Sequence, residues 1–158
     1  GMDKRYYHDL LGVNSRLDSL QAAILKVKLK YLDSYNQKRQ NAANEYNNAL
    51  KNHENIITPF HNISRSSHVY HQYTLRVTNS DRDKLAEHLS GDNIPYGIYY
   101  PLPLHKQKAY HNDSYIEDNF KVTNKMVNEV ISLPMHSELD ENQIDYISSS
   151  IKSFFKNK

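Results

Sequence analysis

Histidine and tyrosine supply most of the side chains in this sequence that could do chemistry. Its 158 residues include nine His and thirteen Tyr, but no Cys. The lack of Cys excludes disulfides, cysteine-ligated metals and thiol nucleophiles. His68 and His71 lie three residues apart, and in a strand such side chains point to opposite faces, which argues against a metal site. No G-x-S-x-G sequence supports a serine hydrolase, so we assign neither a metal nor a catalytic residue.

The first stretch with a chemical pattern runs from Tyr7 to Ala23 (YHDLLGVNSRLDSLQAA). Asn14 and Arg16 lie where a helix is expected to begin. Backbone N–H groups and the helix dipole favour an anion at such a point. The alternative is an ordinary helix cap with a solvent-facing Arg16, and the local pattern alone favours that alternative.

The second stretch runs from Tyr99 to Tyr110 (YYPLPLHKQKAY). Its two prolines stiffen a turn that follows a predicted strand. The side chains of Tyr99, Tyr100 and His105 at the end of a strand suit a sugar or phosphate ligand. A proline-rich connection with packed aromatic rings explains the pattern equally well.

One long helix is expected to carry the first stretch. The sequence from Ser15 to Asp18 fits a capping box, and no Pro or Gly follows before Pro59. Helix formers from Leu17 to Leu50 predict a helix of roughly 50 Å. Because a compact chain of this size has a radius of gyration of about 15 Å, the helix should extend beyond its own domain.

Two apolar stripes run along the first half of this helix. One consists of Leu17, Leu20, Ala23, Ile24, Val27 and Tyr31, and the other of Ala22, Leu25, Leu29 and Leu32. A small core covers one stripe, so the second calls for a partner. We therefore expect a homodimer or higher oligomer centred on Leu25, Leu29 and Leu32. The alternative is that residues 17–32 fold back or fray and the chain stays monomeric.

The remaining sequence predicts a small α/β domain of two layers (α+β), in which helices cover a three-stranded sheet. The expected strands are residues 68–77, 94–100 and 130–133. The expected helices are residues 81–90, closed by Gly91, then 115–128 and 141–155, with a helical turn at residues 106–110.

Composition limits the partners and the compartment. Twenty basic against eighteen acidic residues leave a net charge of +2, which selects neither nucleic acid nor an anionic membrane. No apolar run is long enough to span a bilayer and no leader sequence is apparent, so a cytoplasmic location is expected. Gly1 before Met2 is typical of a cloning remnant, and residues 1–5 are expected to lie outside the folded chain.

Together the two stretches resemble the DegT/StrS family of PLP-dependent nucleotide-sugar aminotransferases. The resemblance rests on Y-H-x-x-x-G-V-N-S-R-L-D from Tyr7, on the segment from Ile98 to His105, and on S-L-P-M-H from Ser132. It implies the C-terminal part of a fold-type I aminotransferase. Residues 6–50 would then be the edge of the catalytic domain with the linking helix, and residues 51–158 the small C-terminal domain.

The resemblance also implies roles for individual residues. Asn14 would reach the coenzyme phosphate of a neighbouring subunit, and Arg16 would help to line the same coenzyme site. His8 would stand at this shared site. The side chains implied to approach the sugar nucleotide are His8, His71, Tyr99, Tyr100 and His105.

The sequence departs from the family in one respect. The large N-terminal domain carries the lysine that binds PLP, and no Lys here has the Gly-rich, strand-bounded setting of that residue. The expected partner is therefore the missing PLP domain, and no PLP is expected to bind stably to this chain alone. This predicts an inactive C-terminal part of an enzyme that transfers an amino group from glutamate to a keto-sugar nucleotide. The alternative is a stand-alone dimerisation or interaction module without coenzyme.

Overall fold

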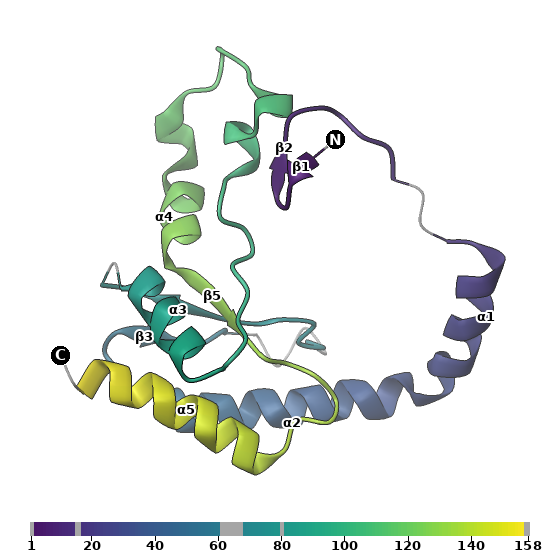
Figure 1. Cartoon of the computed structure of the whole chain (residues 1–158), viewed down its shortest axis with the longest axis vertical. Coiled ribbons are helices and arrows are strands. Elements are labelled where there is room, and N and C mark those ends of the chain that lie inside the picture. The colour runs from purple at the N-terminus through teal and green to yellow at the C-terminus, as the bar shows by residue number, and fades with distance from the viewer. Residues whose placement is uncertain (1, 15–16, 61–67, 80, 157–158) are drawn as a thin grey trace.

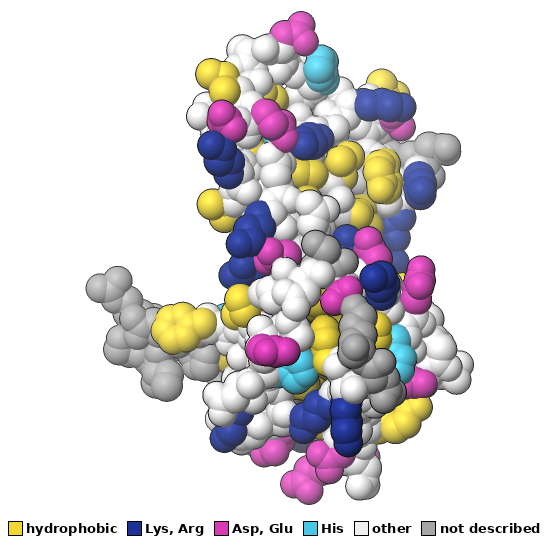
Figure 2. Space-filling view, turned by 90° about the vertical axis from the view of Figure 1, so that its left-hand side faces the viewer, with side chains coloured by type: hydrophobic (Ala, Val, Ile, Leu, Met, Phe, Trp, Pro, Cys, Tyr) yellow, Lys and Arg dark blue, Asp and Glu magenta, His cyan; other side chains and the backbone are white. Residues whose placement is uncertain are grey.

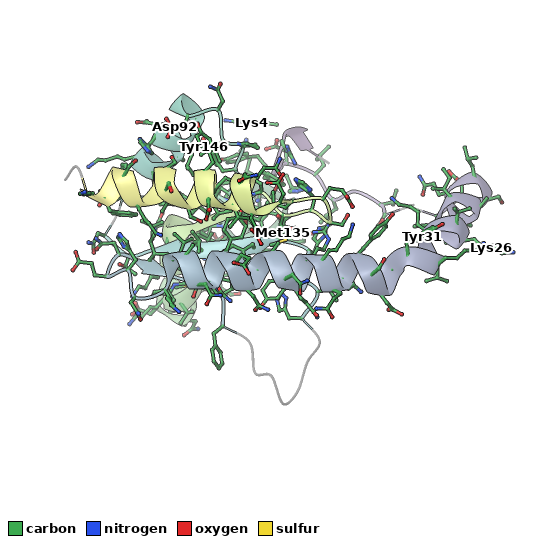
Figure 3. The ribbon with its side chains drawn as sticks, turned by 90° about the horizontal axis from the view of Figure 1, so that it is seen from below. Lys4, Lys26, Tyr31, Asp92, Met135 and Tyr146 are labelled. Atoms are coloured by element: carbon green, nitrogen blue, oxygen red, sulfur yellow. The ribbon has the colours of Figure 1, made fainter. Side chains whose placement is uncertain are left out.

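A three-stranded antiparallel sheet lies at the centre of the fold. The structure is a computed structural model that describes residues 2–14, 17–60, 68–79 and 81–156. The strands follow the order β3 (Ile56–Ile57), β4 (Tyr73–Val77) and β5 (Val130–Leu133). Helices α2 (Leu32–Leu50) and α5 (Glu141–Lys156) lie side by side across one face of this sheet (Figures 1 and 3). The expected two-layer α/β fold with its long N-terminal helix is confirmed.

Alternation along β4 explains which face of the sheet is covered. Tyr73, Leu75 and Val77 are fully buried, while the residues between them are half-buried. This period of two directs one row of side chains towards α2 and α5. The buried apolar residues that form this core are Ala42, Ala43, Tyr46, Leu50, Ile56, Tyr70, Tyr73, Leu75, Val77, Leu85, Ala86, Leu89, Ile94, Ile131, Leu133, Ile144, Ile147 and Ile151.

Two arginines hold the other elements to the sheet. Arg76 of β4 donates to Glu129 Oε2 through Nε (3.0 Å) and Nη2 (2.8 Å). The buried Arg82, in α3 (Arg82–Gly91), donates to the carbonyls of Val127 and Val130, each at 3.1 Å. These carbonyls lie at the end of α4 (Lys121–Glu129) and the start of β5. The contacts therefore fix the angle at which α4 leaves the sheet (Figure 1).

A second group of elements lies beside α4, away from the central sheet (Figure 1). It consists of the hairpin β1 (Met2–Lys4) and β2 (Tyr7–His8) and the 3-10 turns η2 (Leu104–Lys106), η3 (Lys108–Tyr110) and η4 (Glu117–Phe120). The expectation that residues 1–5 lie outside the fold is wrong for residues 2–4, because they pair with β2.

The predicted single helix over residues 17–50 is interrupted. It consists of α1 (Ser19–Lys28), the 3-10 turn η1 (Leu29–Tyr31) and α2. At the junction the Ser34 hydroxyl donates to the Tyr31 carbonyl (2.8 Å), and such a local bond competes with the helical pattern. Asp18 is the N-cap of α1, because its Oδ1 accepts the Gln21 N–H (2.8 Å), and the expected cap Ser15 lies outside the described residues.

Helix α1 also differs from expectation in its environment. None of its residues is buried, so neither apolar stripe is covered by the rest of this chain. Figure 3 shows the labelled Lys26 and Tyr31 beyond the end of the packed helices. The expectation that the domain itself covers one stripe is wrong.

Three further boundaries differ from the predictions. The expected strand over residues 94–100 is reduced to one bridge between Gly97 and Ser132, and β3 takes the place of the third strand. Flanking prolines explain this, since Pro has no N–H for a ladder. Helix α3 ends at Gly91, but the left-handed residue after it is Asn93 (φ 57°). The expected helix over residues 115–128 begins as η4 and continues as α4.

Charges of both signs are interspersed over the face drawn in Figure 2. Basic and acidic side chains alternate there, so this face presents no extended field of one sign. In the described part of the chain, no helix is both long enough and apolar enough to cross a membrane.

The buried tyrosines predict how stability depends on alkaline pH. Burial raises the pKa of Tyr46 and of Tyr73 well above the ordinary range. Below about pH 10, the unfolded-state pKa, both phenols are protonated in both states and their contribution is complete. Above it the unfolded chain loses these protons first, so the free energy of unfolding should fall. Urea unfolding between pH 8 and pH 11 measures this.

The variant Tyr46→Phe/Tyr73→Phe should lose less stability over the same pH range than the wild type. Tyr110→Phe, at an exposed position, is the matched control and should follow the wild type. Equal pH dependence in all three proteins would contradict the prediction.

Candidate functional site

The two chemically patterned stretches meet through the side chain of Gln107. This residue is only 5% exposed. Its Oε1 accepts the His8 N–H (2.9 Å), and its Nε2 donates to the Tyr6 carbonyl (2.8 Å). An exposed ion pair between Lys108 and Asp9 (2.8 Å) joins the same two segments, and the hydrogen bond to Asp9 raises the pKa of Lys108.

Three tyrosine rings come together beside this junction. The Tyr6 ring contacts the Tyr99 ring edge-on, with centroids 5.9 Å apart, and the Tyr100 ring with centroids 5.5 Å apart. Tyr6 has φ 69°, a left-handed conformation that costs about 1–2 kcal/mol for a residue with a Cβ. Such strain clusters at binding sites. Tyr100 remains 61% exposed, so its ring is accessible from the solvent.

His105 lies under aromatic side chains. Its side chain is 8% exposed and stacks on the Phe120 ring at 3.9 Å between centroids. Its Nε2 lies 3.7 Å from Glu117 Oε2 and has no hydrogen-bond partner among the described residues. The hydrogen bond from Lys106 holds the pKa of Glu117 below its usual range. Within this chain, His105 therefore joins η2 to η4.

His71 follows a second strained tyrosine. Tyr70 has φ 46°, and its carbonyl accepts Arg39 Nη1 at 3.2 Å. The same nitrogen donates to the carbonyls of His71 (3.5 Å) and Met135 (3.0 Å). Arg39 thus ties the loop that carries His71 to the segment after β5.

A cavity of about 180 Å³ is lined both by Gln72, which follows His71, and by Tyr99 of the tyrosine cluster. Its lining residues are Gln72, Pro95, Tyr96, Gly97, Tyr99, Ser132, Leu133, Pro134 and Met135. Tyr99 therefore borders both the cavity and the Tyr6 ring.

The structure brings only some of the predicted site residues together. His8, Tyr99 and Tyr100 belong to one cluster through Tyr6 and Gln107. Gln72, the neighbour of His71, lines the cavity beside Tyr99. Asn14 is exposed, and the described residues 9–14 that follow β2 lead away from the hairpin (Figure 1). Arg16 lies outside the described residues.

Three residues of this site carried no signal in the sequence: Tyr6, Gly97 and Gln107. Gln107 contacts residues about a hundred positions away, and no local pattern reports such a contact. A Cβ on Gly97 would overlap the Tyr99 ring, so the missing side chain is what admits that ring. The prolines in the same part of the sequence were the only indication that the segment containing Gly97 and Gln107 is unusual.

Comparison with known proteins gives one consistent result. The sequence profile of the DegT/DnrJ/EryC1/StrS aminotransferase family matches residues 1–152. The "Pleiotropic regulatory protein" of Geobacillus stearothermophilus is 39% identical over 158 residues, which are 99% of this chain and 42% of that protein. The "UDP-2-acetamido-2-deoxy-3-oxo-D-glucuronate aminotransferase" of Pseudomonas aeruginosa is 40% identical over 151 residues, or 96% of this chain and 40% of that protein.

A solved structure agrees with these matches. The S. venezuelae DesV crystal structure, in complex with a ketimine intermediate, superposes with a TM-score of 0.81 at 31% identity. The match covers 98% of this chain and 41% of that one. The chain thus spans about 40% of the length of the curated relatives it matches.

The position of the Tyr99 ring can be tested at Gly97. In Gly97→Ala the new methyl group takes space that the ring occupies, so Tyr99 must turn away from Tyr6. We expect the nuclear Overhauser contacts between the two rings to disappear and the free energy of unfolding to fall by about 1 kcal/mol. In Gly91→Ala, where nothing lies within 4 Å of the added atom, the contacts should persist. Unchanged contacts in Gly97→Ala would show that Gly97 does not place this ring.

Proposed function

We propose, because this chain belongs to the DegT/DnrJ/EryC1/StrS aminotransferase family, that it forms the C-terminal part of a PLP-dependent nucleotide-sugar aminotransferase. In this proposal the complete enzyme transfers an amino group from glutamate to a keto-sugar nucleotide in the cytoplasm. The match over residues 1–152 carries the proposal. The name of the P. aeruginosa relative supports an amino-transfer reaction on such a sugar, and the likeness to DesV in sequence and fold agrees with it.

The proposed division of the chain follows its packing. Residues 51–158 form the small C-terminal domain together with the second half of α2, whose Ala42, Ala43, Tyr46 and Leu50 share its core. Residues 6–50 would be the edge of the catalytic domain together with the helix that links it to the small domain. The exposed α1 supports this assignment, because its apolar side chains need a covering surface.

The described residues do not form a complete coenzyme site. Every lysine among them is exposed, whereas a lysine that binds PLP covalently needs a shielded setting that lowers its pKa. Asn14 is exposed on the segment that follows β2. We therefore derive no catalytic step from this chain and assign the covalent chemistry of PLP to the remaining part of the enzyme.

The proposed contribution of this chain is substrate positioning. His8, Tyr99 and Tyr100 would contact the sugar nucleotide, with His71 at the far side of the cavity. The ring hydroxyls and the imidazole offer donors and acceptors to a sugar, and the ring faces pack against its apolar side. Asn14 and Arg16 would reach the coenzyme site of a neighbouring subunit. His105 would act at the edge of this site by holding η2 in place.

A second candidate function is a stand-alone interaction module without coenzyme. One observation favours it: a relative of 39% identity bears the name "Pleiotropic regulatory protein". The exposed apolar surface of α1 would then serve a protein partner. Amino-transfer activity after assembly with a PLP domain separates the two candidates.

Assembly with a PLP domain tests the proposed function. The experiment joins the N-terminal part of the P. aeruginosa relative to this chain, so that the matched segment is replaced. We expect the chimera to transfer an amino group from glutamate to the 3-keto sugar nucleotide named for that relative. Each half alone should be inactive. A folded chimera that binds PLP but transfers no amino group would contradict the proposal.

The isolated chain provides the control. After incubation with PLP and borohydride, we expect no stoichiometric adduct on a single lysine, because no described lysine is buried. Mass spectrometry of the digested protein measures this. A stoichiometric adduct on one lysine would contradict the proposed division between the two parts.

We further propose that isolated copies of this chain associate through α1 and η1. Leu25, Leu29 and Leu32 are 54%, 67% and 46% exposed, and such a row is rarely left uncovered in a monomer. A second copy of the same helix is the simplest cover. Sedimentation equilibrium at micromolar concentration should give a dimer or higher oligomer.

The variant Leu25→Lys/Leu29→Lys should be monomeric, because four added charges per dimer would meet at the contact. Val122→Lys, which changes an exposed apolar residue on α4, is the matched control and should keep the oligomeric state. A monomeric wild type, or a double variant that still associates, would rule out this surface.

A further inference from the structure

One buried side chain carries the contact between the N-terminal hairpin and the rest of the fold. Both polar ends of the Gln107 amide bind the hairpin backbone, at His8 N–H and at the Tyr6 carbonyl. The amide therefore satisfies a donor and an acceptor on the hairpin, as a neighbouring strand would. A carboxamide offers a donor and an acceptor in a fixed planar arrangement without carrying a charge.

We propose that Gln107 is a positioning residue that fixes His8 relative to Tyr99 and Tyr100. The hairpin needs such an anchor, because strands of two and three residues are too short to hold a conformation by themselves. The geometry of the contact is independent of the reaction. Only the use of His8 at the sugar nucleotide rests on the proposed function.

The other contacts between the hairpin and this segment are weaker anchors. The Lys108–Asp9 ion pair is exposed on both sides, with side chains 83% and 45% accessible, and exposed pairs contribute little. The Tyr6 ring meets two rings edge-on, but both of these lie on a connection that is bridged to the sheet at Gly97 and not at the tyrosines themselves. Gln107 differs from both anchors because its hydrogen bonds are shielded from water. At such a buried position, a donor or acceptor left without a partner is costly.

Amide hydrogen exchange in the 158-residue chain tests this role. In Gln107→Leu both bonds are lost, so the protection factor of the His8 amide should fall about tenfold or more. The amides of β4 should keep their protection, which shows that the core remains folded. Lys108→Ala removes only the exposed ion pair and is the matched control, for which the His8 protection factor should change less than about threefold.

Gln107→Glu adds a readout that loss of packing would not produce. The ionised carboxylate accepts the His8 N–H but cannot donate to the Tyr6 carbonyl, whereas the protonated acid does both. The His8 protection factor should therefore be low at neutral pH and recover as the pH falls through the carboxyl titration. Asp9, Lys108 and His8 itself are present in the wild type, in Gln107→Leu and in Gln107→Glu, so the first two provide the pH reference for the third.

Two results of the exchange experiments would overturn the proposal. One is a His8 protection factor in Gln107→Leu equal to that of Lys108→Ala, with β4 still protected. The other is a Gln107→Glu protein whose His8 protection has the same pH dependence as the Leu variant. Neither depends on amino transfer, so failure of the anchor is distinguishable from failure of the proposed function. In the active chimera, Gln107→Leu should raise KM for the sugar nucleotide more than it lowers kcat, and an unchanged KM would overturn the positioning role.

Discussion

The stacked rings of Tyr46 and Tyr73 join the long helix to the sheet, and the rest of the fold depends on this contact. Their centroids lie 4.8 Å apart, and neither side chain is exposed. Each hydroxyl has a partner: Tyr46 donates to the Pro134 carbonyl (3.1 Å) and Tyr73 to Asn47 Oδ1 (2.7 Å). The stacked rings therefore pack α2 against β4, and their two hydrogen bonds fix the orientation of α2 relative to β4 and to the segment after β5.

The same contact explains why α2 is buried on one side whereas α1 is exposed. Side chains of α2 that face Tyr73 are buried, whereas α1 begins beyond the reach of the sheet. A core of this size cannot cover a helix that runs far past it. The apolar residues of α1 are therefore left exposed in this chain. The exposed part of the helix thus meets the packed part near η1, where the helical pattern is interrupted.

The sequence predicts the parts of the molecule in which local pattern and packing agree. Helix α5 forms where it is expected, and β4 occupies the second half of the strand expected over residues 68–77, where the side chains alternate in burial. The expected strand over residues 94–100 fails because its prolines remove ladder donors.

In the candidate site, the sequence motif around Tyr99 predicts side chains that lie close together in the structure. The covered position of His105 was not predictable, because it depends on Phe120, fifteen residues further along the chain. The role of Gln107 was equally hidden, since its partners lie at the other end of the sequence.

The two strained tyrosines of the candidate site are held in the same way. Tyr6 and Tyr70 both adopt left-handed backbone conformations, and each lies one or two residues before a histidine of the site. The carbonyl of each accepts a hydrogen bond from a distant side chain: Gln107 binds Tyr6 at 2.8 Å, and Arg39 binds Tyr70 at 3.2 Å. A left-handed tyrosine persists only when its surroundings determine it. The two donors therefore set the backbone from which His8 and His71 project, and the positions of both histidines depend on residues that lie far from them in the sequence.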